Sequence, residues 1–288
     1  GAGNDTVNGG ASYFDGGAGD DTITLPNGHF GDYLVDYLDG GADNDTLILS
    51  SNFGSTSFGS TAIGLKVINF ETITFKESAP TFTLGSQAAS AGKSLTINIG
   101  TWAREFTSLA QGNITFNGGD WTNSDDIGDT VILGSGNDIV NLYKGNDKIT
   151  AGGGNDTIDG GLGTDIAIFS GNKSNYTITK ISYGKYRVSD NRGINGTDTL
   201  ENIETLRFAD QDVDITPSGQ NLNGGNSNDT ITAGSGDDLI NGLAGNDTLK
   251  GLGGDDEIYG GDGDDTIEGG NGDDILTGST GNDVIDGG

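Results

Sequence analysis

A nine-residue repeat over residues 224–286 constrains the fold of this chain more than any other feature. The sixth position of all seven units is Asp, the eighth is Ile or Leu, and the fourth is Gly except for Ser227 in the first unit. Gly at positions one, two and four allows a tight turn, and positions seven to nine suit a short strand. A strand of three residues cannot bury a core by itself, so the units must stack, with each Ile or Leu over its counterpart.

The stacked Asp side chains at position six need positive charge beside them. Adjacent layers would lie about 4.8 Å apart, and carboxylates at that spacing repel one another. A site built only from carboxylate and carbonyl oxygens suits a hard cation, and Ca²⁺ best of all. The candidate metal ligands of this block are Asp229, Asp238, Asp247, Asp256, Asp265, Asp274 and Asp283.

Two further blocks carry the same pattern. Residues 124–168 keep strict phase through five units, with the candidate ligands Asp129, Asp138, Asp147, Asp156 and Asp165. Residues 1–49 hold a worn version, with the candidate ligands Asp5, Asp21 and Asp45. The phase slips at 9–15 and again at 25–30, and each slip is expected to remove or weaken a metal site.

The pattern GGxGxDxUx, where U is apolar, resembles the nonapeptide of the RTX (repeats-in-toxin, haemolysin-type) calcium-binding proteins. The resemblance implies that two nonamers form one right-handed coil of a parallel β-roll. It also implies that Ca²⁺ lies between turns two nonamers apart, held by the position-six Asp and by carbonyls of the Gly-rich turn. The expected fold is therefore all-β, a right-handed parallel β-roll or β-solenoid interrupted by β-rich inserts. On this basis the three blocks would hold about eight to eleven Ca²⁺ ions.

Two stretches without the repeat separate the blocks. In residues 50–123 nine of the 21 aromatic side chains gather, and short apolar runs predict strands at 65–75, 81–84, 94–99 and 113–116. One short helix is predicted at 101–111. In residues 169–223 a β-hairpin is predicted from 175–181 and 186–190, and NIETLRF (202–208) matches NFETITF (69–75), which indicates a duplicated module. The expected segments are 1–49, 50–123, 124–168, 169–223 and 224–288.

The composition excludes several kinds of partner and site. The chain has 43 acidic residues against 13 basic ones and a net charge of −30, so nucleic acid and anionic membranes are poor partners. It has no Cys, which excludes disulfides and thiolate metal sites. No apolar run approaches the roughly 20 residues of a transmembrane helix. Because the sequence begins and stops inside repeats, we expect it to be a piece of a longer bacterial exoprotein.

No catalytic motif accompanies the repeats, so we expect no enzyme activity in these residues. The single histidine, His29, excludes an HExxH zinc site and suits an exposed loop. Three functions stay open. The first is an extracellular, calcium-binding structural region of a secreted or cell-surface bacterial protein, such as a surface layer, adhesin or filament. The second is the calcium-dependent folding and secretion region of an enzyme or toxin whose active domain lies elsewhere. The third is a module whose inserts bind cell-surface glycans or other copies of the chain. By resemblance, export would use type I secretion.

Overall fold

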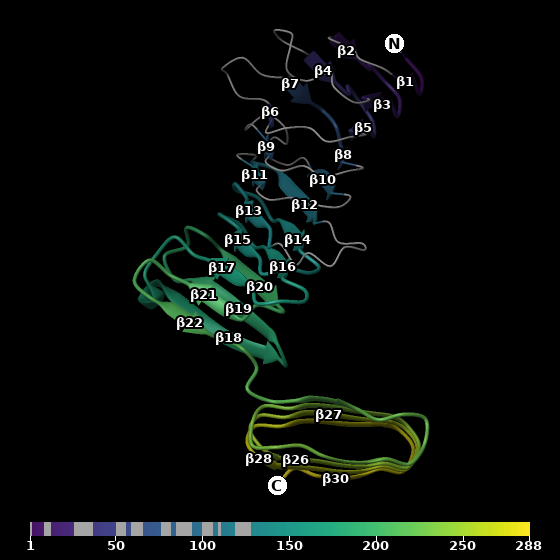
Figure 1. Ribbon diagram of the computed structural model, residues 1–288, viewed down its shortest axis with the longest axis vertical. Coiled ribbons are helices and arrows are strands. Elements are labelled where there is room, and N and C mark those ends of the chain that lie inside the picture. Colours follow the sequence, from purple (N-terminus) through teal and green to yellow (C-terminus); the bar gives the residue numbers. More distant parts are fainter. Residues whose placement is uncertain are drawn as a thin grey trace. The chain divides into compact units, whose positions relative to one another are not determined.

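The computed structural model shows a protein made almost entirely of short parallel strands (Figure 1). It describes residues 2–8, 13–25, 37–49, 56–58, 66–75, 82–84, 94–99, 106–108, 111–118 and 128–288. His29 lies outside these ranges. Within them the helical structure is a single 3-10 turn, η1 (Lys173–Asn175), and no helix is long and apolar enough to cross a membrane. The expectation of an all-β fold is confirmed.

The chain divides into two compact units, which are described separately. Unit 1 comprises Gly1–Thr179 and Tyr186–Asp214, and unit 2 comprises Lys180–Lys185 and Ile215–Gly288. The five segments expected from the sequence mark where the repeat is regular or absent, and as domains they remain a proposal.

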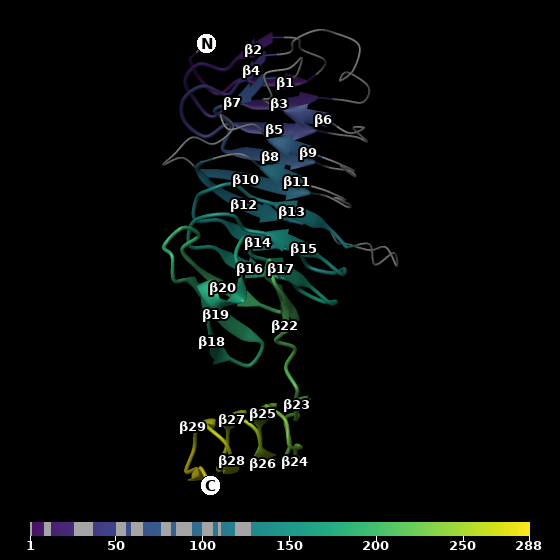
Figure 2. The same cartoon turned by 90° about the vertical axis from the view of Figure 1, so that its left-hand side faces the viewer.

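Unit 2 is built from two parallel sheets that face each other (Figure 2). One sheet contains β23 (Asn221–Asn223), β25 (Leu239–Ala244), β27 (Glu257–Asp262) and β29 (Ile275–Thr280). The other contains β24 (Thr230–Thr232), β26 (Thr248–Gly253), β28 (Thr266–Asn271) and β30 (Val284–Asp286). Strands that are neighbours in a sheet are two nonamers apart in sequence, so two nonamers form one coil, as predicted.

The position-eight side chains of unit 2 form its core. Ile240, Leu249, Ile258 and Ile267 are at most 1% exposed. The register places Ile240 beside Ile258 in one sheet and Leu249 beside Ile267 in the other. Each of these four nonamers therefore contributes one fully buried apolar side chain, worth about 1.5–3 kcal/mol of burial, whereas Ile231 and Leu276 are only partly buried. This is a thin core for a Gly-rich backbone, whose ordering costs more entropy than that of other residues.

Unit 1 repeats this arrangement with longer sheets. The first has the order β1-β3-β5-β8-β10-β12-β14-β16-β20-β19-β18, the second β22-β21-β17-β15-β13-β11-β9-β6, and the third β2-β4-β7. The strands of the first sheet are β1 (Thr6–Asn8), β3 (Thr22–Leu25), β5 (Thr46–Leu49), β8 (Thr72–Phe75), β10 (Ser94–Ile99), β12 (Asn113–Asn117), β14 (Ile139–Asn141), β16 (Thr157–Asp159), β18 (Tyr176–Ser182), β19 (Lys185–Asp190) and β20 (Thr197–Glu201). The others are β2 (Tyr13–Asp15), β4 (Tyr37–Asp39), β6 (Thr56–Phe58), β7 (Lys66–Ile68), β9 (Phe82–Leu84), β11 (Phe106–Ser108), β13 (Thr130–Ile132), β15 (Lys148–Thr150), β17 (Ile166–Ile168), β21 (Thr205–Arg207) and β22 (Asp212–Asp214).

The described strands of residues 50–123 continue the same sheets as the repeats on either side. Ile73 pairs with Ile97, Ile97 with Phe116, and Phe116 with Val140. Sheet pairing requires alternating apolar residues in register, and it does not require a nine-residue turn. The solenoid therefore runs through this stretch with longer connections between its strands.

The helix predicted at 101–111 is wrong where the structure describes it. Residues Phe106–Ser108 form β11, which pairs in parallel with β9 and β13. The ring of Phe106 is 1% exposed and stacks on Phe116 with 4.8 Å between centroids. Burial in the sheet interior decided the conformation, because β-structure depends more on packing than on local propensity. Within that range the description covers only β11 and Gln111.

The predicted hairpin is present as neighbouring strands β18 and β19. Beside them, Phe169, Tyr176 and Phe208 pack with ring centroids 5.1–5.3 Å apart. The Arg192 guanidinium lies over Tyr176 and forms an ion pair of 2.9 Å with buried Asp190, which lowers the pKa of Asp190 to about 2. These contacts cover the apolar core where β16 and β17 are followed by β20 and β21.

Candidate metal sites in the turns

The position-six carboxylates of successive coils are linked in a row that we call the inner ladder. The backbone N–H of Asp247 donates to Oδ1 of Asp265 at 2.8 Å, and that of Asp256 donates to Oδ1 of Asp274 at 2.9 Å. In unit 1 the N–H of Asp138 donates to Oδ1 of Asp156 at 2.8 Å. One carboxylate oxygen therefore satisfies the backbone of the preceding coil.

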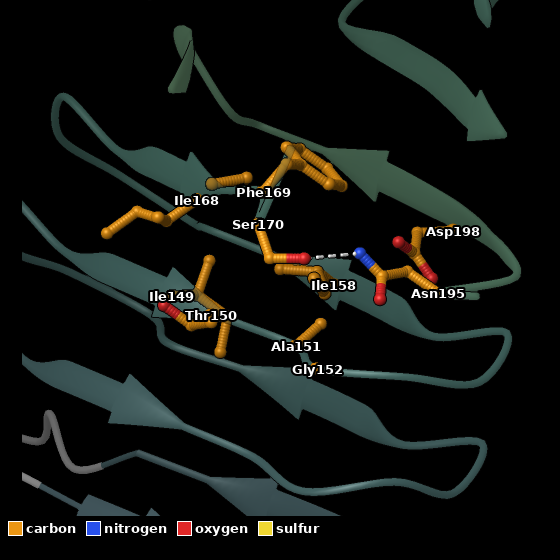
Figure 3. Close-up of a pocket in the computed structure, with 11 residues that line it drawn as sticks. Ile149, Thr150, Ala151, Gly152, Ile158, Ile168, Phe169, Ser170, Asn195 and Asp198 are labelled. Atoms are coloured by element: carbon orange, nitrogen blue, oxygen red, sulfur yellow. Dashed lines mark hydrogen bonds between the residues drawn. The ribbon is translucent and has the colours of Figure 1, made fainter. Parts of the chain in front are cut away.

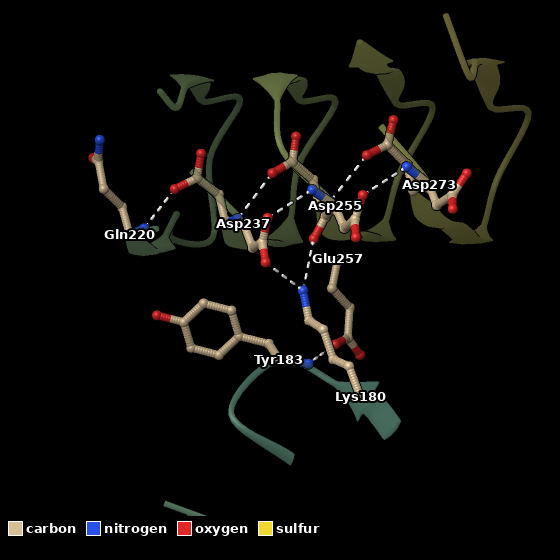
Figure 4. A network of polar contacts seen from close by, with 10 residues as sticks. Lys180, Tyr183, Gln220, Asp237, Asp255, Glu257 and Asp273 are labelled. Carbon is tan, nitrogen blue, oxygen red and sulfur yellow. Dashed lines mark hydrogen bonds and ion pairs between the residues drawn. The ribbon is translucent and has the colours of Figure 1, made fainter. Parts of the chain in front are cut away.

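The position-five side chains form a second row, the outer ladder, with the opposite direction. The N–H of Asp255 donates to Oδ1 of Asp237, and the N–H of Asp273 donates to Oδ1 of Asp255, both at 2.9 Å (Figure 4). Asn246 takes the same part, because its Oδ1 accepts from Asp264 N–H. Position five thus needs an acceptor oxygen and no particular charge, which explains why Asn and Asp both occur there.

The second oxygen of many inner-ladder carboxylates is buried and has no hydrogen-bond partner. This holds among the described residues for Oδ2 of Asp21, Asp45, Asp138, Asp156, Asp247, Asp256, Asp265 and Asp274. A buried charged oxygen without a partner destabilises the fold by roughly the penalty of an unpaired buried polar group or more, which is several kcal/mol. A cation beside the oxygen would remove this penalty. The row of Oδ2 atoms is therefore the strongest sign of a missing positive charge.

Burial of these carboxylates favours their neutral form when no cation is present. Desolvation raises the pKa of Asp138 to about 6. It also raises the pKa values of Asp45 and Asp256, to which the negative charges of neighbouring carboxylates contribute. A bound divalent ion would reverse this balance, because it favours the ionised form of every carboxylate that faces it.

Backbone oxygens converge on the same turns. A Cβ added to Gly251, at position one, would lie under 3.0 Å from Asp256 Oδ2 and 2.6 Å from the carbonyl oxygen of Gly269, one coil further on. Gly260 has the same relation to Asp265 Oδ2 and to the Gly278 carbonyl. In these two turns position one must be Gly, because a carboxylate oxygen and a carbonyl oxygen occupy the space of a side chain. Other units, such as 133–141 and 233–241, carry Leu or Ala at this position.

This donor set fits Ca²⁺. The described residues contain no group of three or more His, Cys, Asp or Glu side chains placed to hold a metal, so backbone carbonyls must complete the coordination. Carboxylate and carbonyl oxygens, with no nitrogen or sulfur donor among them, suit a hard cation. Ca²⁺ is such a cation and takes about six to eight oxygen ligands.

The predicted ligands differ in their surroundings. Asp129, Asp147 and Asp165 are buried members of the inner ladder. Asp5 and Asp283 lie at ladder ends, where Asp5 is exposed and Asp283 is half-buried. In the first two turns of residues 224–286 the second oxygen is already engaged, because Oδ2 of Asp229 accepts from Gly225 N–H at 2.6 Å and Oδ2 of Asp238 accepts from Gly234 N–H at 3.0 Å. As calcium ligands, all of these Asp residues remain a proposal.

Three members of the inner ladder were missed from the sequence. Oε2 of Glu71 accepts from Asp45 N–H at 2.8 Å, Oε2 of Glu204 accepts from Asp165 N–H at 2.6 Å, and Oδ1 of Asp198 accepts from Asp156 N–H at 3.0 Å. A signal for the two Glu residues was present, since each belongs to the shared N-x-E-T motif.

The N-x-E-T motif builds a shortened turn. Its first residues, Asn69 and Asn202, have φ of 55° and 53°, a conformation that Asn tolerates better than most residues. Their side chains donate to Oδ1 of Asp39 and of Asp159. A turn of this kind brings a Glu to the ladder without the Gly-rich segment of the nonamer, and the longer Glu side chain spans the extra distance.

Comparisons with known proteins agree with this reading of the turns. The family model described as RTX calcium-binding nonapeptide repeat (4 copies) matches residues 1–23, 30–51, 132–167, 219–249, 242–276 and 268–288, together more than half of the chain. Among solved structures, the chain is similar to the extracellular lipase LipA from Serratia marcescens, with 23% identity and a TM-score of 0.36. That likeness covers 66% of this chain and 38% of the lipase chain. No curated protein matches the chain.

Proposed function

Because this chain belongs to the family of RTX calcium-binding nonapeptide repeat proteins, we propose that it is an extracellular structural region of a secreted or cell-surface bacterial protein that folds on Ca²⁺ after export. Its repeats bind Ca²⁺. A surface layer, an adhesin or a filament is the kind of protein in which such a region would serve. The single observation that carries the proposal is the row of buried Oδ2 atoms without hydrogen-bond partners.

The physical argument is one of balance. Without a cation, unit 2 stacks buried carboxylates on a Gly-rich backbone and fully buries at most one Ile or Leu per nonamer, roughly 1.5–3 kcal/mol each. Charge repulsion and the entropy of ordering the backbone then outweigh the core. Because Ca²⁺ binds the stacked turns and not the unfolded chain, its binding free energy becomes folding free energy.

This coupling supports a role outside the cell. Extracellular calcium modules work at about 10⁻⁴–10⁻³ M Ca²⁺, well above cytosolic concentrations. Unit 2 would stay unfolded before export and fold afterwards. The net charge of −30 keeps the unfolded chain extended and in solution until calcium neutralises it.

Hydrogen–deuterium exchange of the whole chain tests this proposal. In excess EGTA, peptides from residues 219–288 should exchange within seconds, and near millimolar Ca²⁺ they should become protected together. Mg²⁺ at the same concentration serves as the control, because it prefers a smaller octahedral site and retains its waters, so it should give little protection. Strong protection of these peptides in EGTA would contradict the proposal.

A further inference from the structure

Residues 195–201 reproduce a calcium-type turn and strand outside the matched repeats. Gly196 has φ of 79° and lies against the Gly154 carbonyl, as the fourth Gly of a nonamer does. The N–H of Gly154 donates to the Asn195 carbonyl at 3.2 Å. The N–H of Thr197 donates to Oδ1 of Asn155 at 2.8 Å, which continues the outer ladder.

The strand that follows completes the unit. Leu200 pairs with Ile158 and is 0% exposed, as a position-eight residue should be. Asp198 precedes it by two residues and continues the inner ladder from Asp156. Residues 195–201 thus occupy positions three to nine of a nonamer, although β18, β19 and their connections separate them from the previous turn.

Asp156 and Asp198 form a buried carboxylate pair without a cation. They are 1% and 3% exposed, and Oδ2 of Asp156 has no hydrogen-bond partner. The nearby basic group, Arg192, is bound to Asp190.

A cavity adjoins Asp198. It has a volume of about 100 Å³, and Asp198, Asn195 and Ser170 form its polar side opposite apolar residues such as Ile158 (Figure 3). Asn195 Nδ2 donates to Ser170 Oγ at 2.9 Å. A cavity of this size and polarity has room for ordered water, which Ca²⁺ accepts as a ligand in place of missing carbonyls.

We propose that Asp198 is a calcium ligand that completes a further site with Asp156, one coil beyond the last nonamer of residues 124–168. The proposal rests on calcium binding by the repeats. After β18 and β19 the chain then returns to the row of metal sites. The proposed site therefore links the β18–β19 hairpin to the repeat block.

The opposite turn of the same coil gives the contrast. There Asn202 and Glu204 form the shortened turn, in which the Asn202 carbonyl oxygen and Asp165 Oδ2 lie in the space of a Gly160 side chain. Glu204 continues the ladder through its hydrogen bond to Asp165, but it brings no Gly-rich turn with it.

Counting bound calcium in the whole chain tests the proposal. Asp198→Asn keeps the acceptor for Asp156 N–H and removes the charge, so it should lose about one Ca²⁺ per chain, measured by plasma mass spectrometry after dialysis. Asp210→Asn is the matched control, because Asp210 is exposed and its hydrogen bond from Lys173 N–H can persist in the amide. The control should lose none.

Other results separate the alternatives. An unchanged ion count in Asp198→Asn would overturn the proposal and leave Asp198 a purely structural acceptor. Failure of the wild-type chain to bind any Ca²⁺ would refute calcium binding itself. If the variant does not fold, anomalous scattering from wild-type crystals soaked in Tb³⁺ decides, since a peak between Asp156 and Asp198 supports the site and its absence there, with peaks at the repeats, overturns it.

Discussion

Gly251→Ala and Gly253→Ala introduce the same methyl group at two positions of one turn, and we expect opposite results. At Gly251 the new Cβ would lie under 3.0 Å from Asp256 Oδ2 and 2.6 Å from the Gly269 carbonyl oxygen. At Gly253 the neighbour that it meets is the Asn271 carbonyl oxygen at 3.8 Å, an ordinary contact. Only the first variant pushes against the oxygens proposed to hold Ca²⁺.

The magnitudes follow from these contacts. Forcing a methyl group into a filled space costs typically about 1–3 kcal/mol, and here one opposing atom belongs to the backbone of the next coil and cannot rotate away. At Gly253 the alanine restricts the unfolded chain, which stabilises the folded state by about 0.4–1 kcal/mol where the backbone permits it. The two variants should therefore differ by about 1.5–4 kcal/mol in free energy of unfolding.

Urea unfolding in saturating Ca²⁺, with hydrogen exchange followed in peptides from residues 242–286, measures this difference locally. Calcium titration of the same variants should show weaker binding for Gly251→Ala only. Equal stability and equal calcium affinity in the two variants would refute the argument that position one faces the metal oxygens.

Three further predictions concern a carboxylate ligand, a strained backbone position and a buried carboxylate pair. Asp256→Asn should weaken Ca²⁺ binding at least tenfold by titration, about the effect of losing 1.4 kcal/mol, whereas Asp255→Asn should change it little because the outer ladder needs only an acceptor. Ser279→Gly should raise the midpoint of thermal unfolding, since Ser279 has φ of 78° and relief of this strain is worth about 1 kcal/mol. In EGTA, unit 1 should lose stability as pH rises from about 4 to about 8, because the pKa values of Asp156 and Asp198 are higher in the folded chain than in the unfolded chain. The neutral carboxyls favour folding fully below this pH range, and that stability is lost as they ionise. Calorimetry at pH 5 and pH 8 should show the higher unfolding midpoint at pH 5, and saturating Ca²⁺ should abolish the difference.

The features predicted best from sequence are those that recur in many units of the repeat. The phase of Ile240 and Ile258, two nonamers apart, was enough to predict their pairing in one sheet and their burial. Asp247 and Asp265 were expected in one row for the same reason, and they lie in it. Repetition averages out local ambiguity, because each unit must satisfy the same neighbours as the unit before it.

The features that were missed occur only once or twice in the chain. Phe106 lies in a segment whose local sequence allowed a helix, and only its pairing with strands far away in sequence made it part of a sheet. Residues 193–201 read GINGTDTLE, with Gly, Asp198 and Leu200 at positions four, six and eight of a nonamer, but this copy stands alone and so lacks the repetition that marks the blocks. Glu71 and Glu204 replace Asp after a shortened turn, so a search for Asp in fixed phase passes over them.

The two ladders explain why the sixth position is always Asp in residues 224–286 while the fifth varies. A side chain of the outer ladder needs only an oxygen that accepts from the next coil, and Asn228, Asp237, Asn246, Asp255 and Asp264 all supply it. A position-six side chain of the inner ladder needs two oxygens. One accepts a hydrogen bond from the preceding coil, and the second, charged oxygen is directed into the turn. Asn would supply the first and not the second. A chain that needed only to stack would accept Asn at both positions, so the strict Asp at position six is itself an argument that these turns were selected to hold a cation.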